Sequence, residues 1–292
     1  MSTVIRPKKM KRSPPGMEDT FVGKLLLDAG ALNELDVSRV VQAQRQQNLR
    51  FGEAAEQLGL VSADDIQRAL SRQFEYPYVS PGESRLSPKL VAAYQPFGPI
   101  AESLRALRAR LSLLWFNDQN RVLMVTGARA GAGSSSLAAN LAVVFSQLGR
   151  KTLLVDANFR DPAQESLFGL ESGGGLSSLL VGRISFHSAY VPVPHFDHLS
   201  VLCAGAPPPN PQELLARATF TYLVEAASDK FDIVLFDAPP ILDYADAQMI
   251  AARGGACLLA TRRHHTKLTE VERAGALIQS IGAVMLGAVL ND

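Results

Sequence analysis

The chain has 292 residues, of which 47% are hydrophobic and 20% charged, with a formal net charge of +1. This length accommodates one large and one small domain, and the low net charge argues against a protein that binds nucleic acid through overall basicity. Its two cysteines, Cys203 and Cys257, sit in apolar runs typical of buried strands, which favours a reducing compartment. No apolar run reaches the roughly 18 residues of a membrane span, and the N-terminus lacks a signal-peptide core. We therefore expect a cytoplasmic protein that meets a membrane only through a partner.

Residues 1–18 combine five basic side chains with three prolines and almost no apolar residues. Such a composition buries too little surface to fold, so we expect a disordered basic tail. A tether to anionic lipid is the alternative.

Residues 19–80 contain an internal repeat, which predicts a small all-helical domain. Each copy has the pattern of a short helix, a glycine stop, a polar cap and a second amphipathic helix. The residues that recur 29 positions later are Gly23, Gly30, Val37 and Gln44, which correspond to Gly52, Gly59, Ile66 and Gln73.

This repeat resembles the MshEN domain found at the N-terminus of type II secretion and pilus ATPases. Some members of that family bind cyclic di-GMP through two Arg-Leu-Gly…Gln motifs. Here only the second copy has its arginine, in Arg50-Phe51-Gly52, whereas the first begins Phe21-Val22-Gly23. Because a diphosphate ligand would lose half of these cationic contacts, the resemblance favours a docking module over a cyclic di-GMP sensor.

Residues 81–99, rich in proline and serine, are expected to form a linker to a domain over 100–292. In that domain apolar runs of strand type alternate with helical segments, which predicts a doubly wound, mostly parallel α/β sheet. Such sheets bind ligands at the carboxyl ends of their strands. The expected strands are 121–126, 152–156, 198–203, 231–237, 256–261 and 283–290.

A loop of small residues lies between the first strand and a helix, where backbone N–H groups and the helix dipole bind phosphate. Ser135 stands where a P-loop hydroxyl binds Mg²⁺, and Ser134 stands where the lysine of Gly-Lys-Ser/Thr is expected. The candidate nucleotide-binding residues are Ala128, Arg129, Ala130, Gly131, Ala132, Gly133, Ser134, Ser135 and Ser136.

Two later strands each end in an aspartate, Asp156 and Asp237. Carboxylates at these ends lie close to the phosphates, where they hold Mg²⁺ or take a proton. A lone aspartate there is more often a turn or cap residue, but two of them behind a glycine-rich loop favour a P-loop nucleotide site. Asn291 follows the last strand, where it could either contact the base of the nucleotide or cap the end of the strand.

The segment from about Ile100 to Asp292 resembles the bacterial tyrosine kinases (BY-kinases) that regulate capsule and exopolysaccharide chain length. The similarity rests on the Glu102-Ser-Leu-Arg105-Ala-Leu-Arg108 helix, the loop, both aspartate motifs, Asn210-Pro-Gln-Glu213-Leu214 and Asp246-Ala-Gln248. The helical front end makes the stand-alone EpsG-type kinases the most similar group.

The resemblance implies ATP and Mg²⁺ as cofactors and a protein tyrosine as acceptor. Ser135, Asp156 and Asp237 would bind the metal, with Asp156 also a candidate base, and Asn158 and Arg160 belong to the motif that Asp156 begins. Glu102, Arg105 and Arg108 resemble the family's subunit-contact motif, so a homo-oligomer is expected. The expected activator is an inner-membrane chain-length determinant protein, and the expected location is the cytoplasmic side of that membrane.

Three departures from the family leave other functions open. The P-loop lysine is Ser134, the second acidic residue of the Asp156 motif is Asn158, and the C-terminal tyrosine cluster is absent. Loss of the central cation slows phosphotransfer by several orders of magnitude. A catalytically impaired pseudokinase scaffold is therefore an alternative, as is a MinD/ParA-like positioning ATPase, although the Asp246-Ala-Gln motif favours the kinase type.

Arg129 lies five residues before Ser134, where MinD/ParA proteins carry a lysine that reaches across a dimer. We hypothesise that it supplies part of the missing charge. Arg129→Ala should then weaken ATP binding in a titration against the natural chain, and unchanged affinity would refute the hypothesis.

Overall fold

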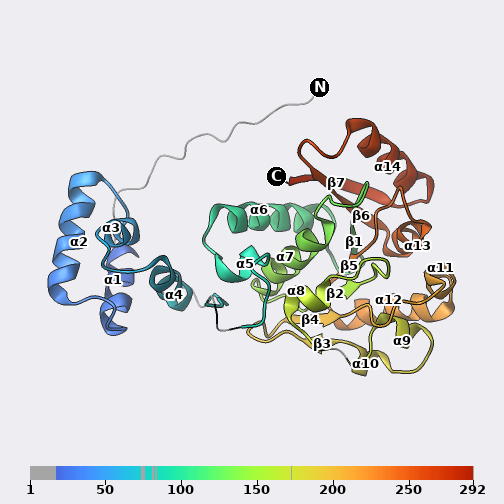
Figure 1. Ribbon diagram of the computed structural model, residues 1–292, viewed down its shortest axis with the longest axis horizontal. Helices are drawn as coiled ribbons and strands as arrows, with labels where there is room; N and C mark the ends of the chain where they lie inside the picture. Colours follow the sequence, from blue (N-terminus) through green and yellow to red (C-terminus); the bar gives the residue numbers. More distant parts are fainter. Residues whose placement is uncertain (1–17, 74–75, 81, 83, 172, 292) are drawn as a thin grey trace. The chain divides into compact units, whose positions relative to one another are not determined.

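The computed structural model describes residues 18–73, 76–80, 82, 84–171 and 173–291 (Figure 1). The basic tail expected over residues 1–18 lies outside this range except for its last residue. The chain divides into two compact units between Tyr76 and Pro77. In the described part of the chain, every helix is too short or too polar to cross a membrane.

The first unit is helical, with α1 (Glu18–Asp28), α2 (Glu34–Gln47), α3 (Phe51–Gln57) and α4 (Ala63–Gln73). The sequence repeat explains its boundaries. Gly30 and Gly59 have φ of +71° and +66°, a backbone conformation that suits glycine after a helix end. Asn33 then caps α2 by accepting a hydrogen bond from the Asp36 N–H at 2.9 Å. Ser62 caps α4 in the same way, because its Oγ accepts from the Asp65 N–H at 3.2 Å.

The repeated glycines also allow close packing inside this unit. A Cβ on Gly23 would lie 3.0 Å from the ring of Phe51, and one on Gly52 would lie 3.2 Å from Ile66. The helices bury a small apolar core of their own, which includes Leu26 and Val40.

The second unit contains a seven-stranded sheet in the order β3-β4-β2-β5-β1-β6-β7. All neighbouring strands run parallel except β3 and β4, so the predicted α/β class is confirmed. The strands are β1 (Val122–Gly127), β2 (Thr152–Asp156), β3 (Val191–Pro192), β4 (Leu199–Leu202), β5 (Ile233–Asp237), β6 (Ala256–Arg262) and β7 (Val284–Asn291).

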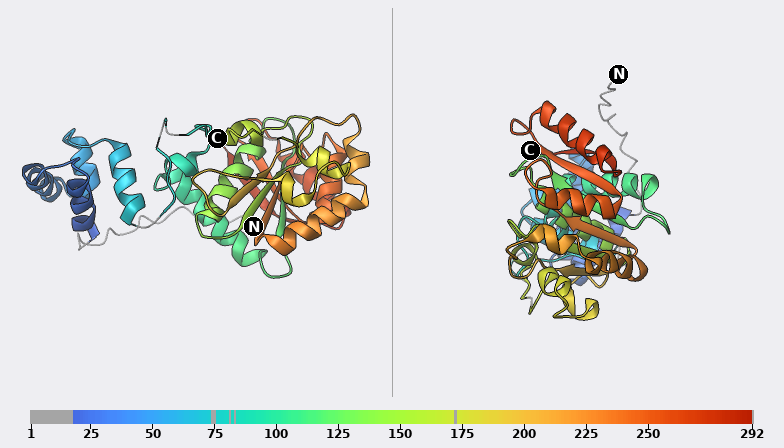
Figure 2. Two further views of the ribbon diagram at one scale, coloured as in Figure 1. Left: turned by 90° about the horizontal axis from the view of Figure 1, so that it is seen from below. Right: turned by 90° about the vertical axis from the view of Figure 1, so that its right-hand side faces the viewer.

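Helices cover both faces of this sheet (Figures 1 and 2), and each face has its own apolar core. On one face lie α5 (Val91–Tyr94), α6 (Pro99–Leu114), α7 (Ser134–Ser146) and α8 (Gln164–Phe168). On the other lie α9 (Leu176–Leu180), α10 (Phe186–Ala189), α11 (Pro211–Leu215), α12 (Ala218–Lys230), α13 (Ala245–Gly254) and α14 (Leu268–Ser280). Helix α7 is buried from Leu137 to Ser146, because its alanines permit close packing on the central strands.

The linker expected over residues 81–99 is instead largely part of the α/β unit. Leu90, Ala92 and Ala93 are completely buried in the core beside α7. Asn140 of α7 accepts a hydrogen bond from the Ala92 N–H and donates to Lys89 O, and Gln147 donates to Ala92 O. The proline content suggested a connector, but apolar burial and these amide contacts order the segment against the sheet domain.

Asn140→Ala should therefore detach this segment, because the buried Ala92 N–H would lose its acceptor. We expect a loss of about 1–3 kcal/mol in the free energy of unfolding and faster proteolysis within residues 84–95. Denaturant titration and limited proteolysis measure both. Ser146→Ala on the same helix is the control, because that hydroxyl only bonds Val143 O of its own turn; equal protease resistance of the two variants would contradict the assignment.

Candidate phosphate and metal site

Two carboxylates meet at the carboxyl edge of the sheet. Asp156 ends β2 and Asp237 ends β5, and the parallel register places these residues directly opposite each other. Both have no exposed surface. Strand β1 pairs with β5 on the other side and delivers the chain into the small-residue loop.

The loop adopts a conformation that depends on its glycines. Gly131 and Gly133 have φ of +82° and +81°, the left-handed region that glycine adopts without strain. Asn291, at the end of β7, donates from Nδ2 to Ala132 O at 2.8 Å, so its side chain contacts the loop. The loop leads into α7, whose first residues are the half-buried Ser134, Ser135 and Ser136.

Asp237 is held by two donors, one on each carboxylate oxygen. Ser135 Oγ donates to Oδ1 at 3.1 Å and Gln164 Nε2 donates to Oδ2 at 2.7 Å. A hydroxyl and a carboxylate oxygen in contact below a phosphate loop are hard ligands suited to Mg²⁺, which takes few protein ligands and completes its shell with phosphate and water. Among the residues that the structure describes, no three His, Cys, Asp or Glu side chains are grouped as they would be in a metal site built from such ligands alone. The donor set fits Mg²⁺.

Asp156 accepts three backbone hydrogen bonds. Its Oδ1 faces the Asn158 N–H at 3.2 Å, and its Oδ2 faces the N–H groups of Ala163 and Gln164, both at 2.9 Å. The carboxylate therefore fixes the turn that follows β2 and the start of α8. Asn158 is buried and accepts from the Asp161 N–H at 3.2 Å.

Burial raises the pKa of both carboxyl groups above the ordinary range. For Asp237 the repulsion of Asp156 raises the pKa further, whereas for Asp156 the three backbone N–H groups oppose the effect of burial. Without a cation, two buried like charges side by side are unfavourable, and a bound divalent cation would relieve this.

A cavity of about 390 Å³ opens beside the carboxylate pair, on the β4 side of the sheet edge. Asp156 forms part of its wall, while the loop and Ser135 lie on the other side of Asp237. The other lining residues are Pro162, Glu165, Ser166, Gly169, Leu170, Ala204 and Gly205.

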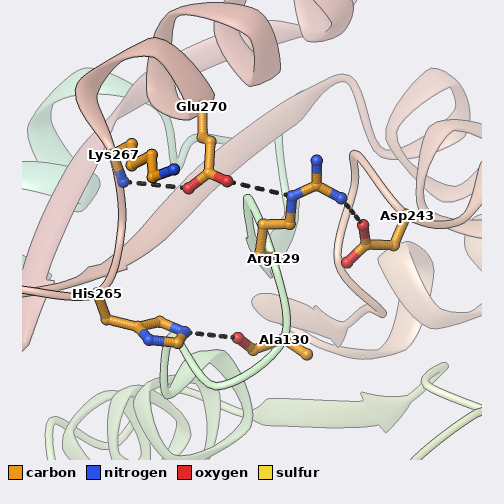
Figure 3. A network of polar contacts seen from close by, with 6 residues as sticks. All are labelled: Arg129, Ala130, Asp243, His265, Lys267 and Glu270. Carbon is orange, nitrogen blue, oxygen red and sulfur yellow. Dashed lines mark hydrogen bonds and ion pairs between the residues drawn. The ribbon is translucent and has the colours of Figure 1, made fainter.

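The two arginines expected beside the phosphates are paired with acidic side chains. Arg129 leaves the loop between Asp243 and Glu270, with its Nε 3.2 Å from Glu270 Oε1 (Figure 3). Arg160 donates to Asp246 at 3.0 Å and its guanidinium stacks over Tyr244. In this conformation the charge that Arg129 was expected to contribute is engaged with two carboxylates.

The three residues of α6 that were expected to contact a neighbouring subunit are not all directed outward. Arg105 pairs with Glu102 at 2.6 Å, and Arg108 donates to Val144 O of α7 at 2.6 Å. Only Glu102 is exposed; the two arginines are half-buried. Arg105 also donates to Pro96 O, outside α7, so within this chain both arginines are engaged by carbonyl groups. The subunit contact expected of these residues stays a prediction.

Gln164 and His265 belong to this site but were not expected from the sequence. Gln164 is completely buried and contacts both carboxylates, and His265 Nε2 lies 3.1 Å from Ala130 O of the loop (Figure 3). Neither lies in a glycine-rich loop or directly after an apolar run, so no local pattern marked them.

Sequence relatives and a solved structure that resemble this chain are named as bacterial tyrosine kinases. Residues 120–169 match the family model of the cellulose biosynthesis protein BcsQ. The chain is 33% identical over 211 residues to the putative tyrosine-protein kinase CapB of Staphylococcus aureus, covering 72% of this chain and 91% of CapB. It is 36% identical over 208 residues to the tyrosine-protein kinase YwqD of Bacillus subtilis, covering 71% and 87%.

Comparison with solved structures also identifies a tyrosine kinase domain. The kinase domain of the Escherichia coli tyrosine kinase ETK aligns with a TM-score of 0.68 at 31% identity, covering 71% of this chain and 81% of that domain.

The raised pKa of Asp237 predicts a pH-dependent effect of Asp237→Asn. An acid whose pKa is higher folded than unfolded binds more protons in the folded state, so its contribution to stability falls as pH rises above about 4. Without metal or nucleotide, the variant should gain stability over the natural chain, and the gain should grow from pH 5 to pH 8. Thermal melts across this range measure it; a pH-independent difference would show that Asp237 has an ordinary pKa.

Proposed function

The chain belongs to the bacterial tyrosine-protein kinase family, and we propose that it binds ATP with Mg²⁺ and transfers phosphate to protein tyrosine. We place this activity in the machinery that sets exopolysaccharide or capsule chain length. The contact of Ser135 Oγ with Asp237 Oδ1 behind the loop is the observation that carries the proposal.

The phosphates of ATP fit the loop of residues 128–136. Its glycines and the start of α7 present backbone N–H groups, which bind anions without any cationic side chain. Ser135 and Asp237 are the residues that would hold Mg²⁺, and the metal would supply charge neutralisation on the transferred phosphate.

The acceptor tyrosine would enter the cavity lined by Asp156, which lies across Asp237 from the phosphate-binding loop. Asp156 lies in its wall, and its raised pKa suits a group that takes a proton near neutral pH. In this arrangement donor and acceptor approach the carboxylate pair from opposite sides.

A pseudokinase scaffold is the second candidate, and the side chains around the loop favour it. Ser134 has no charge, and Arg129 and Arg160, the two cations expected nearby, are both paired with carboxylates. Phosphotransfer relies on preorganised charge stabilisation, so the natural chain would be a weak kinase or a scaffold that retains the fold.

We place the subunit contact on α6. Besides Glu102, its exposed residues include Leu113 and Leu114, which are 87% and 60% exposed, and exposed large apolar side chains favour association. A homo-oligomer, activated by an inner-membrane chain-length determinant protein, would bring the chain to the membrane.

For the helical unit we propose a docking role. Of the two arginines that the cyclic di-GMP motifs would supply, this chain has only Arg50. Its backbone N–H donates to Glu53 at the start of α3. Cyclic di-GMP binding is the alternative for this unit.

Transfer of labelled phosphate from ATP to tyrosine tests the function. We expect weak transfer by the natural chain, loss of that transfer in Asp156→Ala, and a gain of at least tenfold in Ser134→Lys, since a lysine adds a charge-assisted hydrogen bond to the phosphates. The membrane partner should be present in a parallel reaction.

Two outcomes separate the candidates. Activity that appears only in Ser134→Lys would establish the scaffold. Equal activity of the natural chain and Asp156→Ala would contradict the proposed role of Asp156.

A further inference from the structure

Gln164 connects the two strand-end carboxylates through one residue. Its backbone N–H donates to Asp156 Oδ2 at 2.9 Å, and its side-chain Nε2 donates to Asp237 Oδ2 at 2.7 Å. The same Nε2 lies 3.2 Å from Ser135 O, at the start of α7. Gln164 thereby contacts all three residues expected to bind the metal.

The orientation of this amide is determined by its partners. Asp237 Oδ2 and Ser135 O are both acceptors here, so the atom between them must be the NH₂ group. The other end of the amide, Oε1, is buried and has no hydrogen-bond partner among the described residues. A buried acceptor without a partner costs free energy. The contacts of the NH₂ group with Asp237 and Ser135 must offset this cost, so they are what hold the side chain in place.

The hydrogen bond to Oδ2 fixes which way Asp237 faces. With Oδ2 occupied by Gln164, the other oxygen, Oδ1, is directed at Ser135 Oγ. A carboxylate held this way presents one defined oxygen to a cation, and partners behind a metal ligand commonly orient it in this manner.

We propose that Gln164 is a positioning residue for Mg²⁺, which acts by holding the Asp237 carboxylate with Oδ1 beside Ser135. The inference rests on the proposed ATP and Mg²⁺ site and deepens it. Gln164 itself need not touch the metal or the nucleotide; its contribution passes through Asp237.

The test uses the full chain and the fluorescent nucleotide mant-ADP, titrated with and without Mg²⁺. Gln164→Met keeps the length of the side chain but removes the donor. Loss of a residue that orients a metal ligand typically lowers metal affinity 10–100-fold, so the apparent Mg²⁺ affinity should fall by about this factor. Affinity for mant-ADP without Mg²⁺ should stay unchanged, because the loop N–H groups remain.

Gln147→Met is the matched control. Gln147 is also buried, donates to two backbone carbonyls, those of Pro77 and Ala92, and has an Oε1 without a partner among the described residues. It lies at the other end of α7. This variant reports the cost of losing a buried glutamine away from the site, and its Mg²⁺ affinity should equal that of the natural chain.

A second measurement tests whether Gln164 acts through Asp237. In an Asp237→Asn background, Gln164→Met should change Mg²⁺ affinity by less than twofold. If Gln164→Met does not fold, Gln164→Asn takes its place, because asparagine keeps the amide donor on a shorter side chain. The same fall in Mg²⁺ affinity is expected, with no change in mant-ADP affinity when Mg²⁺ is absent.

The outcomes are distinguishable. A Mg²⁺ affinity in Gln164→Met equal to that of the natural chain, or an equal loss in Gln147→Met, overturns the role of Gln164 and leaves the nucleotide site standing. If the natural chain binds no mant-ADP with or without Mg²⁺, the proposed function fails, and the inference about Gln164 fails with it.

Discussion

The α/β unit is organised around two buried carboxylates that face each other across neighbouring strands. Asp156 and Asp237 pair in the β2–β5 register, and burial of two like charges is among the costliest arrangements in a protein interior. Hydrogen-bond donors offset part of this cost: backbone N–H groups of the β2–α8 turn donate to Asp156, and Ser135 and Gln164 donate to Asp237. The turn after β2 and the starts of α7 and α8 are thus held by the same pair.

Much of this arrangement follows from the sequence. Apolar runs that end in aspartate placed both carboxylates, and the glycine spacing placed the loop, because strand periodicity and glycine conformation are local properties. The role of Gln164 and the pairing of Arg129 with Asp243 and Glu270 depend on contacts between segments 73 to 141 residues apart, which no local pattern encodes. The segment near Ala92 belongs to the α/β unit and not to a linker for the same reason: its hydrogen-bond partners lie on α7, distant in the sequence.

Ser134 changes the balance of charge at the site rather than its shape. The loop keeps left-handed glycines and the start of α7 keeps its hydroxyl beside Asp237, so the features that bind phosphate through the backbone are retained. What the substitution removes is a mobile cation, whose main contribution in this chemistry is to stabilise the charge that develops during transfer. Under the proposed function, nucleotide binding and catalysis would separate in this chain, because the loop backbone serves binding and the missing cation serves transfer.

The decisive test of the nucleotide site is a crystal structure of the chain with Mg²⁺ and a non-hydrolysable ATP analogue. We expect the triphosphate on the loop of residues 128–136 and a Mg²⁺ ion held by Ser135 Oγ, with Asp237 Oδ1 facing the metal or one of its waters. A nucleotide bound elsewhere, or a loop left empty at saturating nucleotide while Ser135 stays bonded to Asp237, would contradict it.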